Sequence, residues 1–241
     1  MGCAMVLMDE LNMNEFSERV KKGGLVILPI GSVEEHGEHL PLCTDSIQAE
    51  ALVKRLSEKF DAMVAPAIRY GECSATRNFP GTITITFDTL RALVREVLEE
   101  LCRNGIRRII VLSGHAGRAH MIALREAGKE VVRKVPDLKL MVLSDYEIAY
   151  DLLGKGFDRD DGHAGTIETS RALQIRPDLV KGKPKKGVFR PPKYMIYNDP
   201  ERFFPRGIWG DPSKASAEKG KKVEDYVFKE LVKMIRKDIL R

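Results

Sequence analysis

Short apolar runs alternate along the chain with stretches in which apolar residues recur every three or four positions. The short runs are typical of buried strands, and the three-to-four spacing is typical of helices with one buried face. We expect strands at residues 25–30, 62–66, 107–112 and 138–143. A further run at 82–87 alternates threonine with isoleucine and phenylalanine, which predicts a strand with one wetter face.

Helices are expected between these strands, at 44–60, 88–104, 117–134, 164–174 and from 211 onward. Thr44 or Asp45 is expected to cap the first of them and Asp88 the second, since short polar side chains satisfy the free N–H groups of a helix start. Asp211 followed by Pro212 predicts the start of the last helix. Residues 176–210 hold many prolines and show no clear period.

The alternation of strands and helices predicts an α/β protein with layered elements. The chain has 241 residues, of which 43% are hydrophobic and 31% are charged. That composition supports a folded core, and no internal repeat or glycine-serine linker divides the sequence. We therefore predict a single domain over residues 1–241.

Charge and hydropathy exclude two classes of protein. The net charge of +5 is spread along the chain, which does not favour a nucleic-acid binder. No apolar run approaches the roughly 20 residues needed to cross a bilayer, and the N-terminus makes a poor signal peptide. A cytoplasmic protein with no membrane or nucleic-acid partner is the expectation. The basic stretch 181–193 is interpreted as a solvated loop.

The cysteines, at positions 3, 43, 73 and 102, form no CxxC pair. They are interpreted as free buried thiols rather than as a zinc or redox motif.

Histidine is rare, with five in the chain, and it gathers in segments flanked by glycine and acidic residues. The first segment follows the strand at 25–30 and contains Glu34, His36 and Asp45. The second, around His115, follows the strand at 107–112. The third contains His163 and Glu168 and leads into the helix at 164–174.

These three segments predict a metal site. Glu34 and His36 lie two residues apart, so in extended chain they point to the same side. Carboxylates with imidazoles suit Zn²⁺, Mn²⁺ or Fe²⁺. Ligand sites of α/β sheets lie at the carboxyl ends of strands, where two of the segments begin. The alternative is that each histidine is a hydrogen-bonded structural residue and the glutamates form a solvated turn.

The same segments resemble the signatures of the creatininase family of metal-dependent amidohydrolases. The stretch Gly31-Ser-Val-Glu-Glu-His-Gly-Glu-His-Leu-Pro-Leu-Cys-Thr-Asp45 is similar to the family's opening motif. Further matches follow in order along the chain: Phe79-Pro-Gly-Thr82, Gly114-His-Ala-Gly117, Asp161-Gly-His-Ala-Gly165 with Glu168-Thr-Ser170, and Gly210-Asp-Pro-Ser213 with Ala217-Glu-Lys-Gly220.

The resemblance implies a three-layer α/β sandwich with a mainly parallel central sheet and a centre of two divalent metal ions. By position, Glu34, Asp45 and His115 would hold one ion, while His36 and Asp45 would hold the other. Creatinine-hydrolysing members supply a further glutamate two residues after the turn histidine, where this chain has Gly117. Glu168 is the expected substitute. A homo-oligomer, often a hexamer, is also implied.

The implied reaction is hydrolysis of an amide C–N bond through a metal-bridging hydroxide. His163 would protonate the departing nitrogen, and its alternative role is to orient Glu168. Glu35 and His39 are interpreted as groups that hold the ligands in orientation.

Departures from the family pattern bear on the substrate. Arg118 stands where the turn motif usually carries asparagine, and the segment before Phe79 lacks the histidine of many relatives. Arg77 and Arg118 could bind an anionic group such as phosphate, or could form salt bridges on the surface or between subunits. Trp209 could line the site for a planar substrate, or simply pack.

The expected substrate is a small cyclic amide or formamide. Within the resembled family the alternatives are creatinine itself, a formylaminopyrimidine ribotide of archaeal flavin and deazaflavin synthesis, or a small peptide fragment. The missing acid at 117 counts against creatinine. A metal-binding scaffold without turnover and a nucleic-acid-binding module are the alternatives outside enzymes.

Overall fold

The computed structural model describes residues 5–241, and Cys3 lies outside them. Its centre is a five-stranded sheet in the order β1-β3-β2-β4-β5, in which every strand pair is parallel. The strands are β1 (Val6–Leu7), β2 (Leu25–Ile30), β3 (Met63–Val64), β4 (Arg108–Ser113) and β5 (Lys139–Ser144). Because β2 and β4 are buried on both faces, their sequences are nearly continuous apolar runs.

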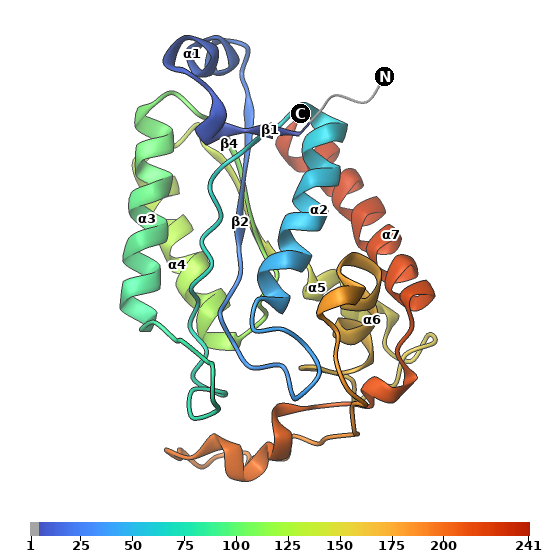
Figure 1. Ribbon diagram of the computed structural model, residues 1–241. Coiled ribbons are helices and arrows are strands. Elements are labelled where there is room, and N and C mark those ends of the chain that lie inside the picture. The colour runs from blue at the N-terminus through green and yellow to red at the C-terminus, as the bar shows by residue number, and fades with distance from the viewer. Residues whose placement is uncertain (1–4) are drawn as a thin grey trace.

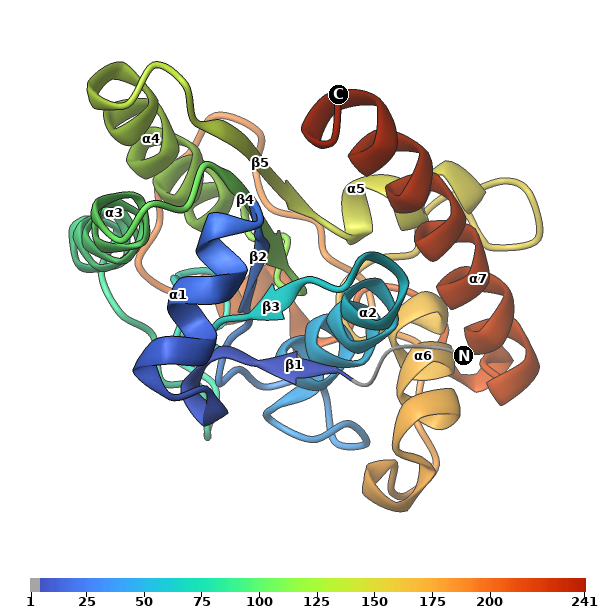
Figure 2. The same ribbon diagram turned by 90° about the horizontal axis from the view of Figure 1, so that it is seen from above.

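Helices cover both faces of the sheet, as Figures 1 and 2 show. They are α1 (Met13–Lys21), α2 (Thr44–Phe60), α3 (Phe87–Arg103), α4 (Arg118–Lys134), α5 (Tyr146–Ala149), α6 (Thr166–Ile175) and α7 (Ala217–Met234). One apolar core forms where α2, α5, α6 and α7 pack on the sheet, and a second forms on the opposite face under α3 and α4. This is the three-layer α/β sandwich with a parallel sheet that the sequence predicts.

The expected strand at 82–87 is wrong. That segment is extended but belongs to no strand: Ile83 donates its N–H to the Val33 carbonyl at 2.8 Å, and Ile85 donates to the Gly71 carbonyl at 2.9 Å. It is therefore held by loops at the end of the sheet rather than by a neighbouring strand.

Several helix starts also differ from expectation. Cys43, not Thr44 or Asp45, is the N-cap residue of α2, and Thr86 rather than Asp88 caps α3. Ser216 caps α7, while Pro212 begins a separate 3₁₀ turn. α6 begins at Thr166 because Ala164 has a left-handed backbone with φ of 53°.

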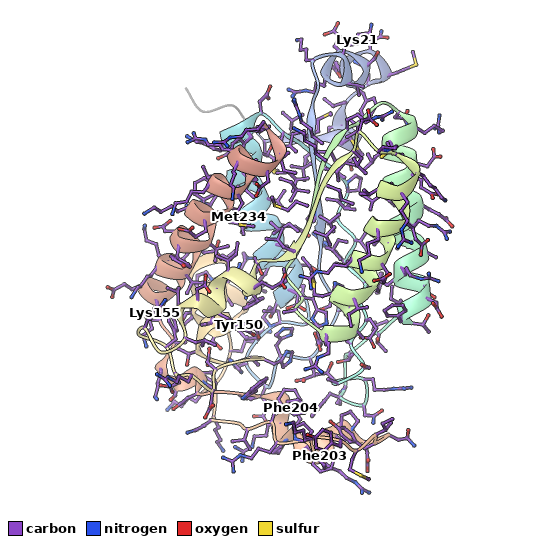
Figure 3. The ribbon with its side chains drawn as sticks, turned by 180° about the vertical axis from the view of Figure 1, so that it is seen from behind. Lys21, Tyr150, Lys155, Phe203, Phe204 and Met234 are labelled. Atoms are coloured by element: carbon purple, nitrogen blue, oxygen red, sulfur yellow. The ribbon has the colours of Figure 1, made fainter. Side chains whose placement is uncertain are left out.

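The loops at the carboxyl ends of the strands form one end of the molecule, at the bottom of Figure 1. The proline-rich segment, orange in that view, runs beneath this end. Phe203 and Phe204 lie in it, as Figure 3 shows. Among residues 5–241, no helix is both long and apolar enough to cross a bilayer.

Candidate metal centre

The three histidine segments meet at the carboxyl ends of β2 and β4, and Asp45 lies between them. One carboxylate oxygen of Asp45, Oδ1, lies 3.1 Å from His36 Nε2. The other, Oδ2, lies 2.9 Å from His115 Nδ1. Asp45 stands in the first turn of α2, and its carboxylate faces the histidines instead of capping the helix. The two oxygens of Asp45 therefore face two different histidines.

Backbone carbonyls orient both histidine rings. His36 Nδ1 lies 3.1 Å from the Glu34 carbonyl oxygen, and His115 Nε2 lies 3.0 Å from that of Glu72. If each of these nitrogens donates its N–H, the remaining ring nitrogen turns its lone pair toward the carboxylates. Metal-binding histidines are commonly oriented in this way.

Two further carboxylates complete the cluster. Glu34 Oε2 lies 3.0 Å from His115 Nδ1, and Glu168 Oε2 lies 3.7 Å from His36 Nε2. Ligand atoms of His36, Asp45 and Glu168 all lie within 4.8 Å of one another. Each of these side chains is buried.

Hydroxyl groups fix two of the carboxylates. Ser32 Oγ donates to Asp45 Oδ2 at 2.6 Å, and Thr76 Oγ donates to Glu34 Oε1. Glu34 Oε2, by contrast, receives no hydroxyl group and faces His115 Nδ1 at 3.0 Å. A buried carboxylate oxygen needs a partner of positive charge, which a ring proton or a cation can supply.

The buried carboxylates of the cluster are also stabilised by positive charge. Burial opposes ionisation of Glu34, but the charges of His115 and His163 bring the pKa of Glu34 down to about 2. Burial opposes a charge on His36, yet Asp45 raises the pKa of His36 to about 10. Burial is likewise outweighed at His115, whose pKa is raised by Glu34 and Asp45. Divalent cations would supply this positive charge in place of the ring protons, so the donor set fits a metal centre.

His163 lies beside this cluster, before the start of α6. Its ring centroid is 4.3 Å from that of His36. Its Nε2 is 2.8 Å from the Glu35 carbonyl oxygen and 3.4 Å from Glu35 Oε1. The side chain is 17% exposed, more than those of the surrounding ligands.

Glu35 and His39 contact the cluster from outside. Glu35 Oε2 accepts the Gly37 N–H at 2.8 Å, within the loop that carries His36. His39 Nε2 lies 2.8 Å from Thr169 Oγ, which joins that loop to α6. Burial, with the charges of His36 and His163, lowers the pKa of His39 to about 4, so this ring is neutral near pH 7.

The three residues expected to bind substrate lie around the site but outside the cluster. Arg77 and Arg118 are exposed, and neither forms an ion pair within residues 5–241. Trp209 is 38% exposed and donates its backbone N–H to the His163 carbonyl at 2.8 Å. It lines a cavity of about 450 Å³ together with Phe189, Arg159 and Arg190.

Sequence reasoning missed the groups that support the cluster from the segment after β3. Cys73 and Thr76 come from that segment, and neither follows a strand end or stands beside a histidine in the sequence. His120 was missed as well: it is fully buried, and its ring packs edge-on against His115 at 4.7 Å. It stands at the start of α4, whereas His115 precedes that helix, so no helical spacing connects the two in the sequence.

The family model for creatininase, described as creatinine amidohydrolase, matches residues 9–235. This match, on a parallel α/β sandwich with buried histidines and carboxylates at its strand ends, defines a metal-dependent amidohydrolase. The chain belongs to the creatininase family.

Individual relatives agree with this assignment. A creatinine amidohydrolase of Pseudomonas putida is 31% identical, with 97% of each chain covered. A mycofactocin precursor peptide peptidase of Mycolicibacterium smegmatis is 32% identical over 83% of this chain and 79% of that protein.

Solved structures are similar over nearly the whole chain. A crystal structure of creatinine amidohydrolase superposes with a TM-score of 0.87 at 28% identity, covering 98% of both chains. A creatininase described as the Mn form has a TM-score of 0.85 at 28% identity, covering 97% of this chain and 98% of that one. A creatininase variant described as Zn-Zn type also has a TM-score of 0.85 at 28% identity, covering 98% and 99%.

Proposed function

We propose that this protein hydrolyses the C–N bond of a small cyclic amide or formamide at a centre for two divalent metal ions. The observation that carries the proposal is the position of Asp45, whose two oxygens face His36 Nε2 and His115 Nδ1 at 3.1 and 2.9 Å. The similar proteins named for creatinine and for a precursor peptide share the amide C–N bond as the bond cleaved.

Glu34, Asp45 and His115 would hold one ion, and His36, Asp45 and Glu168 the other. Glu168 supplies a carboxylate that position 117 cannot, since Gly117 has no side chain; a Cβ there would lie 2.4 Å from His115 Nε2. The ions would be Zn²⁺, Mn²⁺ or Fe²⁺, and the Mn and Zn-Zn forms of the similar structures support the first two. Bound divalent ions lower the pKa of water and polarise a carbonyl group.

A residue of the chain would then supply the proton that the departing nitrogen needs. His163 is the proposed donor to the departing nitrogen, because it lies at the open side of the cluster against His36. Its Nε2 lies on the Glu35 carbonyl oxygen at 2.8 Å, so Nδ1 is the ring nitrogen proposed to donate the proton. Burial and the charge of His36 oppose a proton on His163, but Glu34, Glu35 and Glu168 outweigh them and raise its pKa, which favours the protonated ring that a proton donor needs.

Glu168 has a second proposed role beside that of ligand. Its carboxylate accepts the Ala164 N–H, which fixes the backbone immediately after His163. Glu35 and His39 hold the loop of His36 against His163 and α6. These contacts would hold the proton donor in a fixed position relative to the metal ligands.

The substrate would enter past Trp209, which lines the cavity and whose backbone N–H is bonded to the His163 carbonyl. Arg77 follows Thr76 and Arg118 begins α4 directly after the turn of His115, so both are proposed to meet an anionic substituent. That feature supports a formylaminopyrimidine ribotide over creatinine within this substrate class.

The protein is further proposed to be a cytoplasmic homo-oligomer, with a hexamer as the expected form. Exposed apolar side chains of Tyr194, Met195 and Ile196 in the segment beneath the site support an association of this kind. Light scattering on the purified protein would measure the number of subunits.

The proposed activity is tested by product release from metal-reconstituted protein. The panel contains creatinine, the formylaminopyrimidine ribotide and simple cyclic amides, with Glu34→Ala as the inactive control. We expect turnover of one member and none by the control variant. Two ions bound per chain without turnover of any member would argue instead for a metal-binding scaffold.

A further inference from the structure

His120 and His115 are connected through the backbone of Glu72. His115 Nε2 lies 3.0 Å from the Glu72 carbonyl oxygen, while the Glu72 N–H donates to His120 Nδ1 at 3.3 Å. The Cys73 sulfur also faces His115 Nε2, but from 3.9 Å. One residue of the segment after β3 therefore contacts both histidine rings, and Figure 1 shows this segment running down beside β2 to the end of the sheet where the site is located.

The direction of these hydrogen bonds determines which ring nitrogen of His120 carries hydrogen. A backbone N–H can only donate, so His120 Nδ1 accepts from Glu72 and the hydrogen of the ring is on Nε2. That nitrogen lies 3.0 Å from Ser113 Oγ. Ser113 Oγ in turn donates to the His115 carbonyl at 2.8 Å and accepts the His115 N–H at 3.1 Å. His120 is thus linked to the backbone of His115 through Ser113 and to its ring through Glu72.

The packing around His120 is close. Its side chain is fully buried, and its ring packs edge-on against that of His115 with the centroids 4.7 Å apart. A Cβ at Gly71 would lie 3.0 Å from His120 Nδ1 and 2.9 Å from the Gly31 carbonyl oxygen. A residue without a side chain is therefore needed at position 71 for the segment to approach the ring this closely.

The contact between Glu72 and His115 determines which nitrogen of His115 can meet an ion. When Nε2 donates its hydrogen to the Glu72 carbonyl, the lone pair of the ring is on Nδ1. Nδ1 is the nitrogen that faces the carboxylates, at 3.0 Å from Glu34 Oε2 and 2.9 Å from Asp45 Oδ2. A metal ion among these groups needs that lone pair, and the hydrogen bond at the other nitrogen orients the ring for it.

We propose that His120 is a positioning residue for His115: by accepting the Glu72 N–H, it holds the Glu72 carbonyl on His115 Nε2 and keeps Nδ1 available to the ion. The inference rests on the proposed metal centre and adds to it a residue that contacts a ligand rather than the ion. Without an acceptor at His120 Nδ1, the buried Glu72 N–H would lose its partner, which is costly, so the segment would shift. The Glu72 carbonyl would then leave the His115 ring.

The test compares His120→Leu with His120→Asn in the full-length protein. The two new side chains have nearly the same shape, but the amide oxygen of asparagine can accept the Glu72 N–H where Nδ1 did, and leucine cannot. Binding of Zn²⁺ to metal-stripped protein is measured in competition with a chelator. We expect one ion to bind about 10- to 100-fold more weakly to His120→Leu than to the wild type, the usual effect of losing a group that orients a ligand. His120→Asn should bind close to the wild-type affinity.

His120→Gln separates the two hydrogen bonds of the ring. Its longer side chain carries the amide group to the place of Nε2, where it can meet Ser113 but not the Glu72 N–H. We expect this variant to bind zinc as weakly as His120→Leu. Urea denaturation of the metal-free variants measures their stability separately, because a merely structural role of His120 would lower the free energy of unfolding without weakening zinc binding.

A measurement on the wild type tests the same inference without any substitution. The chain has five histidines, so their ¹⁵N-labelled rings can be resolved by NMR that correlates each ring nitrogen with the carbon-bound hydrogens of the ring. In the zinc-loaded protein we expect His115 and His120 to carry hydrogen on Nε2 and none on Nδ1. This measurement decides the matter if the variants do not fold.

The outcomes separate this inference from the proposed function. Three results would overturn the role of His120 and leave the metal centre standing: zinc binding unchanged in His120→Leu, zinc binding not restored by His120→Asn, or zinc binding restored by His120→Gln instead. Hydrogen on Nδ1 of His120 in the wild type would overturn it as well. A wild type that binds no zinc would overturn both this inference and the proposed metal centre.

Discussion

Asp45 is the residue on which both halves of the proposed metal centre would depend, because its two oxygens face different histidines. Asp45→Asn keeps the size of the side chain but removes its charge and replaces one oxygen with a poor ligand. We expect both ions to bind about 10- to 100-fold more weakly, with hydrolysis falling in step. Metal per chain and initial rates measure this. Asp225→Asn, at an exposed ion pair with Arg55, is the control, and retention of two ions by Asp45→Asn would contradict the bridging role.

His163 should behave differently from the ligands. His163→Ala removes the proposed proton donor without removing a side chain assigned to either ion. We expect the rate to fall about 100- to 10,000-fold while metal content stays unchanged. If the variant loses an ion together with its activity, His163 is a ligand rather than an acid.

The residues of the site were predictable to the extent that their neighbours in the sequence identified them. His36, Asp45 and His115 stand in glycine-rich segments after strong strands, and the structure brings these segments together. Cys73 and Thr76 carry no such pattern, because only the folded path of residues 65–86 places them beside Glu34. The assignment of each residue to one ion or the other stays a prediction.

At the scale of elements, α6 depends on Asp161, which lies before its first turn. Asp161 Oδ1 accepts the Thr166 N–H at 2.6 Å, and Oδ2 accepts the Ile167 N–H at 2.8 Å. Asp161→Ala leaves both N–H groups without an acceptor, so we expect a loss of about 1–2 kcal/mol in the free energy of unfolding. Urea denaturation measures it. Asp178→Ala, at an exposed ion pair, should cost under about 1 kcal/mol, and equal losses in the two variants would contradict this role.

A buried ion cluster ties α6 to its neighbours. Arg171 is fully buried and donates to Asp145 Oδ2 and to Glu224 Oε1, each at 2.6 Å. Arg171→Met leaves two buried carboxylates without their cation, which we expect to cost about 3–5 kcal/mol in unfolding free energy. Arg176→Met, which removes an exposed partner of Asp178, should cost at most about 1 kcal/mol. A small loss for Arg171→Met would show that the cluster adds little to stability.

Helix and strand positions followed well from periodicity, whereas helix ends did not. Aspartate is a common helix-capping residue, but the carboxylate of Asp45 faces His36 and His115 instead of capping α2. Residues 82–87 have the alternation of a strand, yet the sheet offers them no neighbour. In both cases contacts with residues distant in the sequence, at the end of the molecule that holds the site, determine the local structure. The sequence of the segment alone does not reveal those contacts.

At the scale of the whole molecule, the site joins segments that are far apart in the sequence. Glu34 and His36 follow β2, His115 follows β4, and Glu168 belongs to α6. A parallel sheet makes this possible, since the carboxyl ends of its strands lie along one edge. The alternation of apolar runs predicted that sheet, but the course of residues 176–210 beneath the site could not be predicted, because they have no period and make few regular contacts.

Since the proposed ligands come from separate elements, bound metal should stabilise the whole fold. An ion that binds only the folded chain adds about 2.7 kcal/mol when it is present at one hundred times its Kd. Because each kcal/mol shifts the Tm of a chain of this size by roughly 2–4 °C, two ions should raise the Tm by roughly 10–20 °C.

Calorimetry of chelator-treated protein, before and after addition of Zn²⁺ or Mn²⁺, measures this shift. In Asp45→Asn the same additions should change the Tm far less, because the bridging carboxylate is absent. An unchanged Tm in the wild type would mean that the carboxylates at the ends of β2 and β4 are balanced by protons on the histidine rings rather than by metal. The raised pKa values of His36 and His115 describe that proton-bound state, in which no ion is present.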